Sequence, residues 1–223
     1  MASCPTVTYL VRKYRGRDRQ AVRDICVATA WLGAPLQDDT ADGWIWAEFW
    51  TRYFTDREPG CAWVVERCPD GSVVGYLTGT PDEGRARRYV PFLLPGIIGH
   101  VVRRRLLWTT ASRRAILAML GSIAGGELDL PPRAGRDFPA TFHFNLLPEA
   151  RGKGIGAQLF RGYIREMRRM SVPGVHAQTL SINEAVTRFL IRHGFRRIAS
   201  HPLHAFAHVR REPIDLHTWV LPL

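Results

Sequence analysis

Residues 143–160, HFNLLPEARGKGIGAQLF, decide how this 223-residue chain folds. Residues 140–147 are apolar and rich in aromatic side chains, which favours a buried strand. Pro148 has no N–H for a sheet ladder, so regular pairing should end there. A helical spacing of apolar residues follows, at Leu159, Phe160, Tyr163, Ile164 and Met167. The stretch therefore predicts a strand, a glycine-rich loop and a helix.

The loop between this strand and this helix has the features of an anion site. Gly152, Gly154 and Gly156 let the backbone turn sharply and approach a ligand closely. Free N–H groups at a helix N-terminus attract phosphates, and the helix dipole adds to the attraction. Arg151 and Lys153 supply full positive charges beside these groups.

Two well-known phosphate loops do not fit, because the nucleoside-triphosphate P-loop needs Gly-Lys-Ser/Thr and the Rossmann glycines have another spacing. The run instead resembles motif A of the GNAT acyltransferases, Arg/Gln-x-x-Gly-x-Gly/Ala. The resemblance implies that the pyrophosphate of acetyl-CoA, the co-substrate, binds at this loop. The residues concerned are Arg151, Gly152, Lys153, Gly154, Ile155, Gly156 and Ala157.

Residues 183–195 resemble motif B of the same family, Asn-x-x-Ala-x-x-Leu/Phe-Tyr-x-x-x-Gly-Phe. Four positions match, at Asn183, Phe189, Gly194 and Phe195. Val186 replaces the usual Ala and Leu190 replaces the usual Tyr. The resemblance implies that Asn183 contacts the cofactor.

Leu190 has no proton to give to the departing CoA thiolate, a role that the family's tyrosine performs. The proton then comes from solvent or from another residue such as Tyr163 or His193. The absence of the tyrosine also leaves open an alternative function, a non-catalytic acyl-CoA-binding regulatory protein.

In the family, the strand before motif A splays from its neighbour, and its backbone binds the pantetheine arm and polarises the thioester. Here the resemblance places these groups at Asn145, Leu146 and Leu147. The activity implied is direct transfer of an acetyl group from acetyl-CoA to a primary amine, through a ternary complex. The sequence does not identify the amine acceptor.

His143 is the first candidate for the catalytic base, because it shares a strand face with Asn145 and a histidine titrates near neutral pH. A packed core histidine is the alternative. Asp82 is the second candidate, with a turn-forming role as its alternative, and Tyr76 and Glu66 are weaker ones.

The remaining strands are predicted at residues 6–14, 61–66, 72–78, 175–181, 195–200 and 216–221, and helices at about 18–29 and 44–55. The aromatic residues of the second helix either pack in the core or wall an acceptor site. The order strand, helix, helix, strand, strand also resembles the GNAT opening. We expect one α/β (α+β) domain over residues 1–223, with a mixed central sheet of six to seven strands flanked by helices.

Residues 83–138 lengthen the connection between the third and fourth strands, and a structureless loop of this length is uncommon in a compact domain. We therefore predict a helical insertion, with residues 111–124 as a helix and with breaks at Pro91, Pro95, Gly96 and Gly99. It caps the acceptor site, binds a partner or an anionic surface through its arginines, or thickens the core.

Together with Glu58-Pro59, residues 75–82 and the His143 strand, this insertion is similar to the acetyltransferase-like domains of some O-GlcNAc hydrolases and their free-standing bacterial relatives.

The net charge of +11 comes almost wholly from arginine, since Lys13 and Lys153 are the only lysines. Arginine-rich coding or an acidic partner explains it, and without a nucleic-acid motif we expect no nucleic-acid partner. The nearest thing to an acidic groove is a group of four residues, Asp38, Asp39, Asp42 and Glu48.

The four cysteines match no zinc spacing, so we expect no metal. No signal peptide is evident, which favours free thiols in the cytoplasm. No apolar run reaches about 18 residues, so we expect no membrane partner. A last strand at the sheet edge leaves a homodimer open.

Overall fold

A computed structural model describes residues 8–35, 42–68, 70–207 and 212–223, and its centre is a seven-stranded sheet. The strands lie in the order β1-β2-β3-β4-β5-β7-β6, and all neighbours are antiparallel except β4 and β5. The predicted mixed sheet is confirmed. The strands are β1 (Thr8–Lys13), β2 (Ala62–Cys68), β3 (Val73–Thr80), β4 (Ala140–Leu146), β5 (Gly174–Leu180), β6 (Arg196–Pro202) and β7 (Asp215–Pro222).

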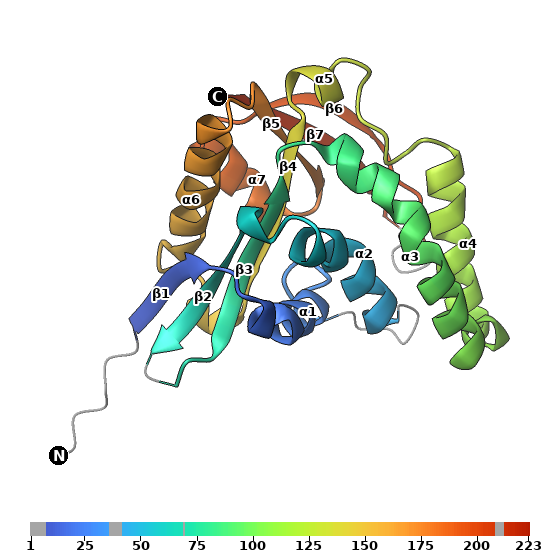
Figure 1. Cartoon of the computed structure of the whole chain (residues 1–223). Helices are drawn as coiled ribbons and strands as arrows, with labels where there is room; N and C mark the ends of the chain where they lie inside the picture. Colours follow the sequence, from blue (N-terminus) through green and yellow to red (C-terminus); the bar gives the residue numbers. More distant parts are fainter. Residues whose placement is uncertain (1–7, 36–41, 69, 208–211) are drawn as a thin grey trace.

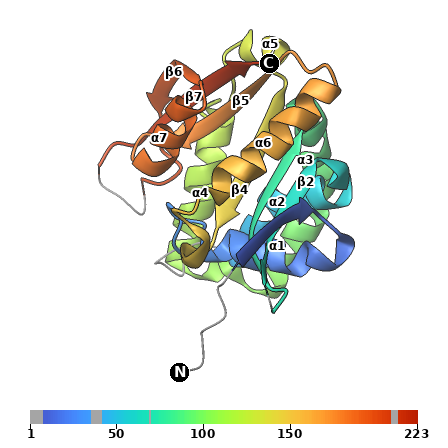
Figure 2. The same ribbon diagram turned by 90° about the vertical axis from the view of Figure 1, so that its left-hand side faces the viewer.

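Two pairs of helices cover opposite faces of the sheet (Figures 1 and 2). One face carries α1 (Arg19–Ala28) and α2 (Gly43–Asp56), and the other carries α6 (Ile155–Arg169) and α7 (Glu184–Arg192). The apolar spacing of α6 places Leu159, Tyr163 and Met167 fully inside the core. Short 3-10 turns complete these layers, at Gly16–Asp18, Pro59–Cys61 and Pro148–Ala150.

The helix α6 can lie close to the sheet because β3 has a glycine beneath it. A Cβ atom added at Gly79 would lie 2.4 Å from a ring carbon of Tyr163. The Tyr163 hydroxyl then reaches the backbone of two strands, donating to Thr141 O at 2.9 Å and to Thr80 O at 3.3 Å.

The insertion between β3 and β4 is helical, as the sequence predicts. It consists of α3 (Glu83–Arg103), a 3-10 turn (Leu106–Trp108), α4 (Thr110–Ala124) and α5 (Ala134–Asp137). The expected breaks are wrong, since α3 continues through Pro91 and Pro95. Tertiary contacts with α2 hold it, because His100 stacks on Trp44 with ring centroids 4.3 Å apart. Such contacts override the low helix propensity of proline and glycine.

The sheet opens between β4 and β5. These parallel strands pair only at Ala140 with Val175 and at Thr141 with His176, and then they diverge. Because they are parallel, α6 and α7 begin at the same open end (Figure 2). The fold thus places two helix N-termini beside an unpaired stretch of β4.

No helix in the described part of the chain is long and apolar enough to cross a membrane.

Candidate active site

The backbone of β4 faces the opening at alternate residues. Leu147 donates its N–H to Val74 O at 2.9 Å, so Leu147 and Asn145 hydrogen-bond toward β3. Leu146 and Phe144 accordingly point their backbone groups toward the opening. The Leu146 carbonyl already accepts from Arg151 Nε at 2.8 Å. Of the three predicted residues, Leu146 therefore has its N–H directed at the opening, and Leu147 does not.

The glycine loop forms a cradle of N–H groups, as its sequence suggests. Gly152 and Gly154 adopt left-handed φ values of 72° and 73°, which other residues adopt only with strain. The N–H groups of residues 152–157 donate to no other residue that the structure describes. They sit at the N-terminus of α6, where the helix dipole favours negative charge. This donor set fits a phosphate group.

The two cations of the loop border this cradle and hold neighbouring segments. Arg151 donates to the carbonyl of Gly33 as well as to Leu146, so it ties the segment after α1 to the end of β4. Lys153 Nζ lies 3.1 Å from the Tyr9 hydroxyl and 4.6 Å from the centroid of its ring. Both remain solvent-exposed.

Asn183 forms the opposite wall, at the start of α7. Its Oδ1 accepts from Val186 N at 3.2 Å, and its Nδ2 has no partner among the described residues. The helices α6 and α7 are close here, because a Cβ at Gly156 would lie 3.7 Å from Phe189. The loop residues 152–157, the Leu146 N–H and Asn183 therefore lie around one opening, whereas Asn145 and Leu147 direct their backbone groups toward β3.

His143 projects from the other face of β4, toward α2. Its ring stacks on Trp50 with centroids 5.1 Å apart, and its Nδ1 lies 3.1 Å from the Tyr76 hydroxyl. Asn145 Nδ2 donates to the same hydroxyl at 3.0 Å. The Nε2 atom of His143 has no hydrogen-bond partner in the described part of the chain. The ring is half-buried.

Burial sets the protonation states of this group. It lowers the pKa of His143 to about 4, so the imidazole is neutral at pH 7. It also raises the pKa of the Tyr76 phenol well above its ordinary value. Burial likewise raises the pKa of Cys26, which lies in the same core cluster as Tyr76, to about 11. With the ring's proton on Nδ1, where it is donated to the Tyr76 oxygen, Nε2 keeps its lone pair and can accept a proton.

The second predicted base lies elsewhere. Asp82 Oδ1 accepts from Gly84 N at 2.9 Å and caps α3, while Oδ2 lies 3.4 Å from Arg85. His143 pairs with Thr78, so Asp82 stands about 13 Å farther along the chain. Its carboxylate therefore has a structural role, as does that of Glu66, which binds Arg12 at 2.6 Å.

No side chain replaces the family's tyrosine as proton donor among the residues considered. Leu190 is fully buried in the core and does not line the opening. The Tyr163 hydroxyl is engaged by the backbone as described above. His193 directs Nδ1 at Phe189 O, at 2.8 Å, and packs against the ring of that residue.

The two members of the acidic group that the structure describes both have partners. Asp42 caps α2 and lies 2.9 Å from His100 Nε2, and Glu48 pairs with Arg23 and with Arg52. Asp38 and Asp39 lie outside the described residues. Within the described ranges, no group of histidine, cysteine and acidic residues could hold a metal ion.

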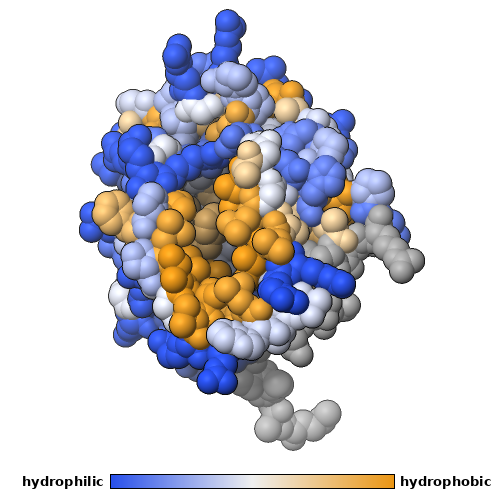
Figure 3. Space-filling model, turned by 90° about the vertical axis from the view of Figure 1, so that its right-hand side faces the viewer, coloured by the Kyte–Doolittle hydropathy of each residue, from blue (hydrophilic) through white to orange (hydrophobic). Residues whose placement is uncertain are grey.

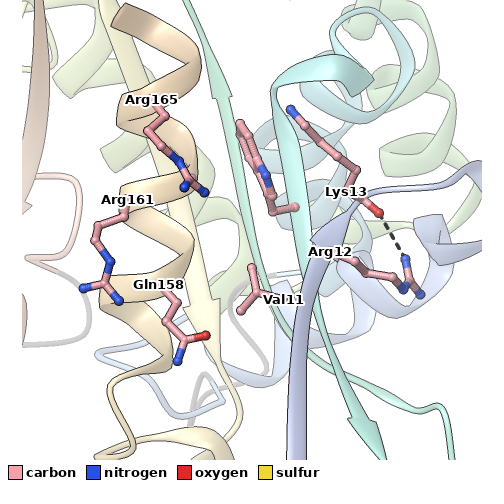
Figure 4. Close-up of a pocket in the computed structure, with 8 residues that line it drawn as sticks. Val11, Arg12, Lys13, Gln158, Arg161 and Arg165 are labelled. Atoms are coloured by element: carbon pink, nitrogen blue, oxygen red, sulfur yellow. Dashed lines mark hydrogen bonds between the residues drawn. The ribbon is translucent and has the colours of Figure 1, made fainter.

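A separate cavity of about 450 Å³ lies between α6 and β1 (Figure 4). Gln158, Arg161 and Arg165 line it from α6, and Lys13 covers the Trp63 ring at 3.6 Å from its centroid. No lining residue comes from β4, β5 or α7. The cavity is a basic groove on the β1 side of α6, apart from the opening.

The sequence did not single out one member of the group around His143. Nothing in its spacing indicated that Cys26 reaches Tyr76, because the contact joins α1 to β3 across the sheet face. Trp50 belongs to the aromatic run for which the sequence left two roles open, core packing or a wall of an acceptor site. It stacks on His143 and also packs against the core cluster that contains Tyr76.

The fold of this chain resembles that of solved acetyltransferases. A GNAT superfamily phosphinothricin acetyltransferase from Sinorhizobium meliloti, in complex with acetyl-CoA, is 17% identical and matches with a TM-score of 0.58, over 97% of this chain and 89% of that one. The chain has the GNAT fold. The protein yncA from Salmonella typhimurium, with acetyl-CoA, matches at 0.56 with 18% identity, over 97% and 94%.

SsHAT shares the GNAT fold and resembles this chain more strongly. The match covers 96% of this chain and 98% of the SsHAT chain, with 28% sequence identity and a TM-score of 0.74. No known family model matches the sequence. The resemblance to acetyltransferase-like domains of O-GlcNAc hydrolases stays a prediction.

Proposed function

We propose that this protein is an N-acetyltransferase that moves the acetyl group of acetyl-CoA directly to a primary amine in a ternary complex. The opening between β4 and β5, with partner-free N–H groups at the start of α6, carries this proposal. Its likeness to acetyl-CoA-dependent GNAT enzymes supports it at the level of the fold.

The site residues then divide between two tasks. The N–H groups of residues 152–157 and the charge of Lys153 hold the pyrophosphate, and Asn183 Nδ2 donates from the opposite wall. The Leu146 N–H, which points into the opening, holds the pantetheine arm or polarises the thioester carbonyl. Asn145 and Leu147 position this strand through their bonds to Tyr76 and Val74.

In the reaction, the amine nitrogen attacks the thioester carbon, a C–N bond forms and the C–S bond breaks. The amine loses a proton and the CoA thiolate gains one. His143 Nε2 accepts the amine's proton, because the lowered pKa keeps the ring neutral at pH 7. Solvent protonates the thiolate, whose ordinary pKa makes it a fair leaving group.

A second function, an acyl-CoA-binding regulatory protein without turnover, is favoured by one observation. Leu190 is buried in the core, and the hydroxyl of Tyr163 is already engaged, so no side chain is assigned to protonate the thiolate. Both functions predict that the protein binds acetyl-CoA, but only the acetyltransferase function predicts release of the CoA thiol.

Isothermal titration with acetyl-CoA tests the shared part, and absence of binding at millimolar ligand would sink both functions. Thiol release from acetyl-CoA, screened against amines and lysine peptides, separates them. We expect His143→Gln to bind acetyl-CoA normally and to release thiol at least tenfold more slowly. His204→Gln, which changes an exposed histidine, serves as the control. No release with any amine would favour the regulatory function.

A further inference from the structure

Helices α3 and α4, with the turn between them, form a hairpin (residues 83–124) that exposes an unusual amount of apolar surface. Of the sixteen large hydrophobic side chains exposed in the described part of the chain, nine belong to this hairpin. They are Phe92, Leu94, Ile98, Val102, Leu107, Trp108, Leu117, Leu120 and Ile123. An exposed patch of this kind indicates an interaction surface.

These residues gather on one side of the molecule. Leu94, Ile98 and Val102 recur every four residues and form a stripe on α3. Figure 3 shows hydrophobic side chains around a hollow on this side, with strongly hydrophilic ones beside them. Trp108, at the turn, is 74% exposed.

Apart from Glu83 at its first position, the hairpin carries only positive charge. Residues 84–126 contain eight arginines and no aspartate or glutamate. Five of these arginines are exposed around the turn and have no carboxylate within ion-pair distance among the described residues; they are Arg103, Arg104, Arg105, Arg113 and Arg114. The apolar turn residues Leu107 and Trp108 therefore project from a ring of uncompensated positive charge.

The combination of exposed apolar side chains and arginines restricts the kind of partner that can dock on the hairpin. A second copy meeting the first across a two-fold axis would bring like patches together, and so bring arginine against arginine. The partner must offer negative charge at its surface and apolar material beneath. A bilayer with anionic lipids offers both, since arginines bind phosphates while Trp and Leu enter the boundary of the acyl chains. Mobile acyl chains also fill the hollow without needing a matching shape.

We propose that the hairpin docks this protein on the surface of an anionic membrane. Leu107 and Trp108 insert at the headgroup boundary, and the arginines around the turn bind lipid phosphates. The contact is peripheral, so it is compatible with the finding on membrane-spanning helices. The expectation of no membrane partner came from the lack of a spanning segment and did not address an interfacial helix. The inference is independent of acetyl transfer.

Co-sedimentation with vesicles tests the proposal on the full chain. We expect binding to phosphatidylcholine vesicles that contain phosphatidylglycerol, little binding to phosphatidylcholine alone, and weakening by salt. Arg113→Gln with Arg114→Gln should weaken binding about 30-fold. Arg168→Gln with Arg192→Gln removes two exposed charges elsewhere and should have a much smaller effect.

The apolar part has its own variant, Leu107→Ser with Trp108→Ser, which should abolish binding while circular dichroism and Tm stay unchanged because both side chains are exposed. Brominated lipid should quench Trp fluorescence in the wild type and less so in Trp108→Phe. The proposal fails if anionic vesicles do not bind, if the Ser variant binds normally, or if this variant dissociates a wild-type dimer. Binding of polyglutamate without binding of anionic vesicles would also overturn it, in favour of an acidic protein partner.

Discussion

Replacement of Gly154 by valine should separate the cost of backbone strain from the cost of losing the phosphate cradle. Gly154 has φ of 73°, and a Cβ there would meet nothing within 4 Å. The penalty is therefore conformational and not steric. A left-handed conformation costs a residue with a side chain about 1–2 kcal/mol. For a chain of this size the expected decrease in Tm is roughly 2–8 °C.

The effect on acetyl-CoA should be larger than this decrease suggests. If the backbone keeps its conformation, the valine side chain occupies the open space beside the N–H groups. If it relaxes, the N–H groups of Gly154 and Ile155 turn away. Loss of one hydrogen bond to a charged group costs about 1.5–3 kcal/mol, which corresponds to a 10- to 100-fold rise in Kd.

Isothermal titration and thermal unfolding of Gly154→Val measure the two effects separately. Gly156→Ala is the matched control, because its Cβ would make only ordinary contacts, 3.6 to 3.8 Å from Phe144, Phe189 and Leu146. It should bind nearly as the wild type does. Wild-type affinity in Gly154→Val, at the expected lower Tm, would refute the assignment of the cradle.

Three further predictions concern the core and the base. Leu190→Tyr should lower the free energy of unfolding by about 1–3 kcal/mol, because position 190 is in the packed core. For the same reason the new tyrosine should not accelerate thiol release. Faster turnover would contradict this placement of residue 190. Gly79→Ala should lower the free energy of unfolding by about 1–3 kcal/mol because the added methyl group displaces Tyr163. Gly99→Ala, in an open helical position, should instead stabilise the fold. Equal denaturant midpoints for the two variants would argue against the close approach of α6 to β3. Burial lowers the pKa of His143 from 6.5 to about 4, so the unfolded chain binds the proton more readily than the folded one, and the free energy of unfolding should fall as pH drops from 6.5 to 4. The variant His143→Gln should lack this part of the loss. Parallel pH profiles of unfolding for the two proteins would rule out this contribution of His143.

The seven strands and the sharp turns of the glycine loop could be predicted from the sequence because their determinants are local. Alternating apolar residues define the strands. A left-handed backbone conformation favours glycine in any fold, and Gly152 and Gly154 both adopt it. His143 and Asn145 share a face for the same reason, since side chains alternate along any strand. The length of residues 83–138 predicted a helical insertion, but the sequence did not predict how its helices pack on the rest of the domain.

Only the tertiary structure decided the features that depend on contacts between distant segments. The helix α3 continues through Pro91 because α2 supports it, and Asp82 caps this helix. The neutral state of His143 depends on burial against Trp50, which lies more than ninety positions away in the chain. Leu190 points into the core because of the way α7 packs on the sheet, which no motif records. Local periodicity specifies which elements form, whereas burial and pairing across the sheet set the chemistry of each side chain.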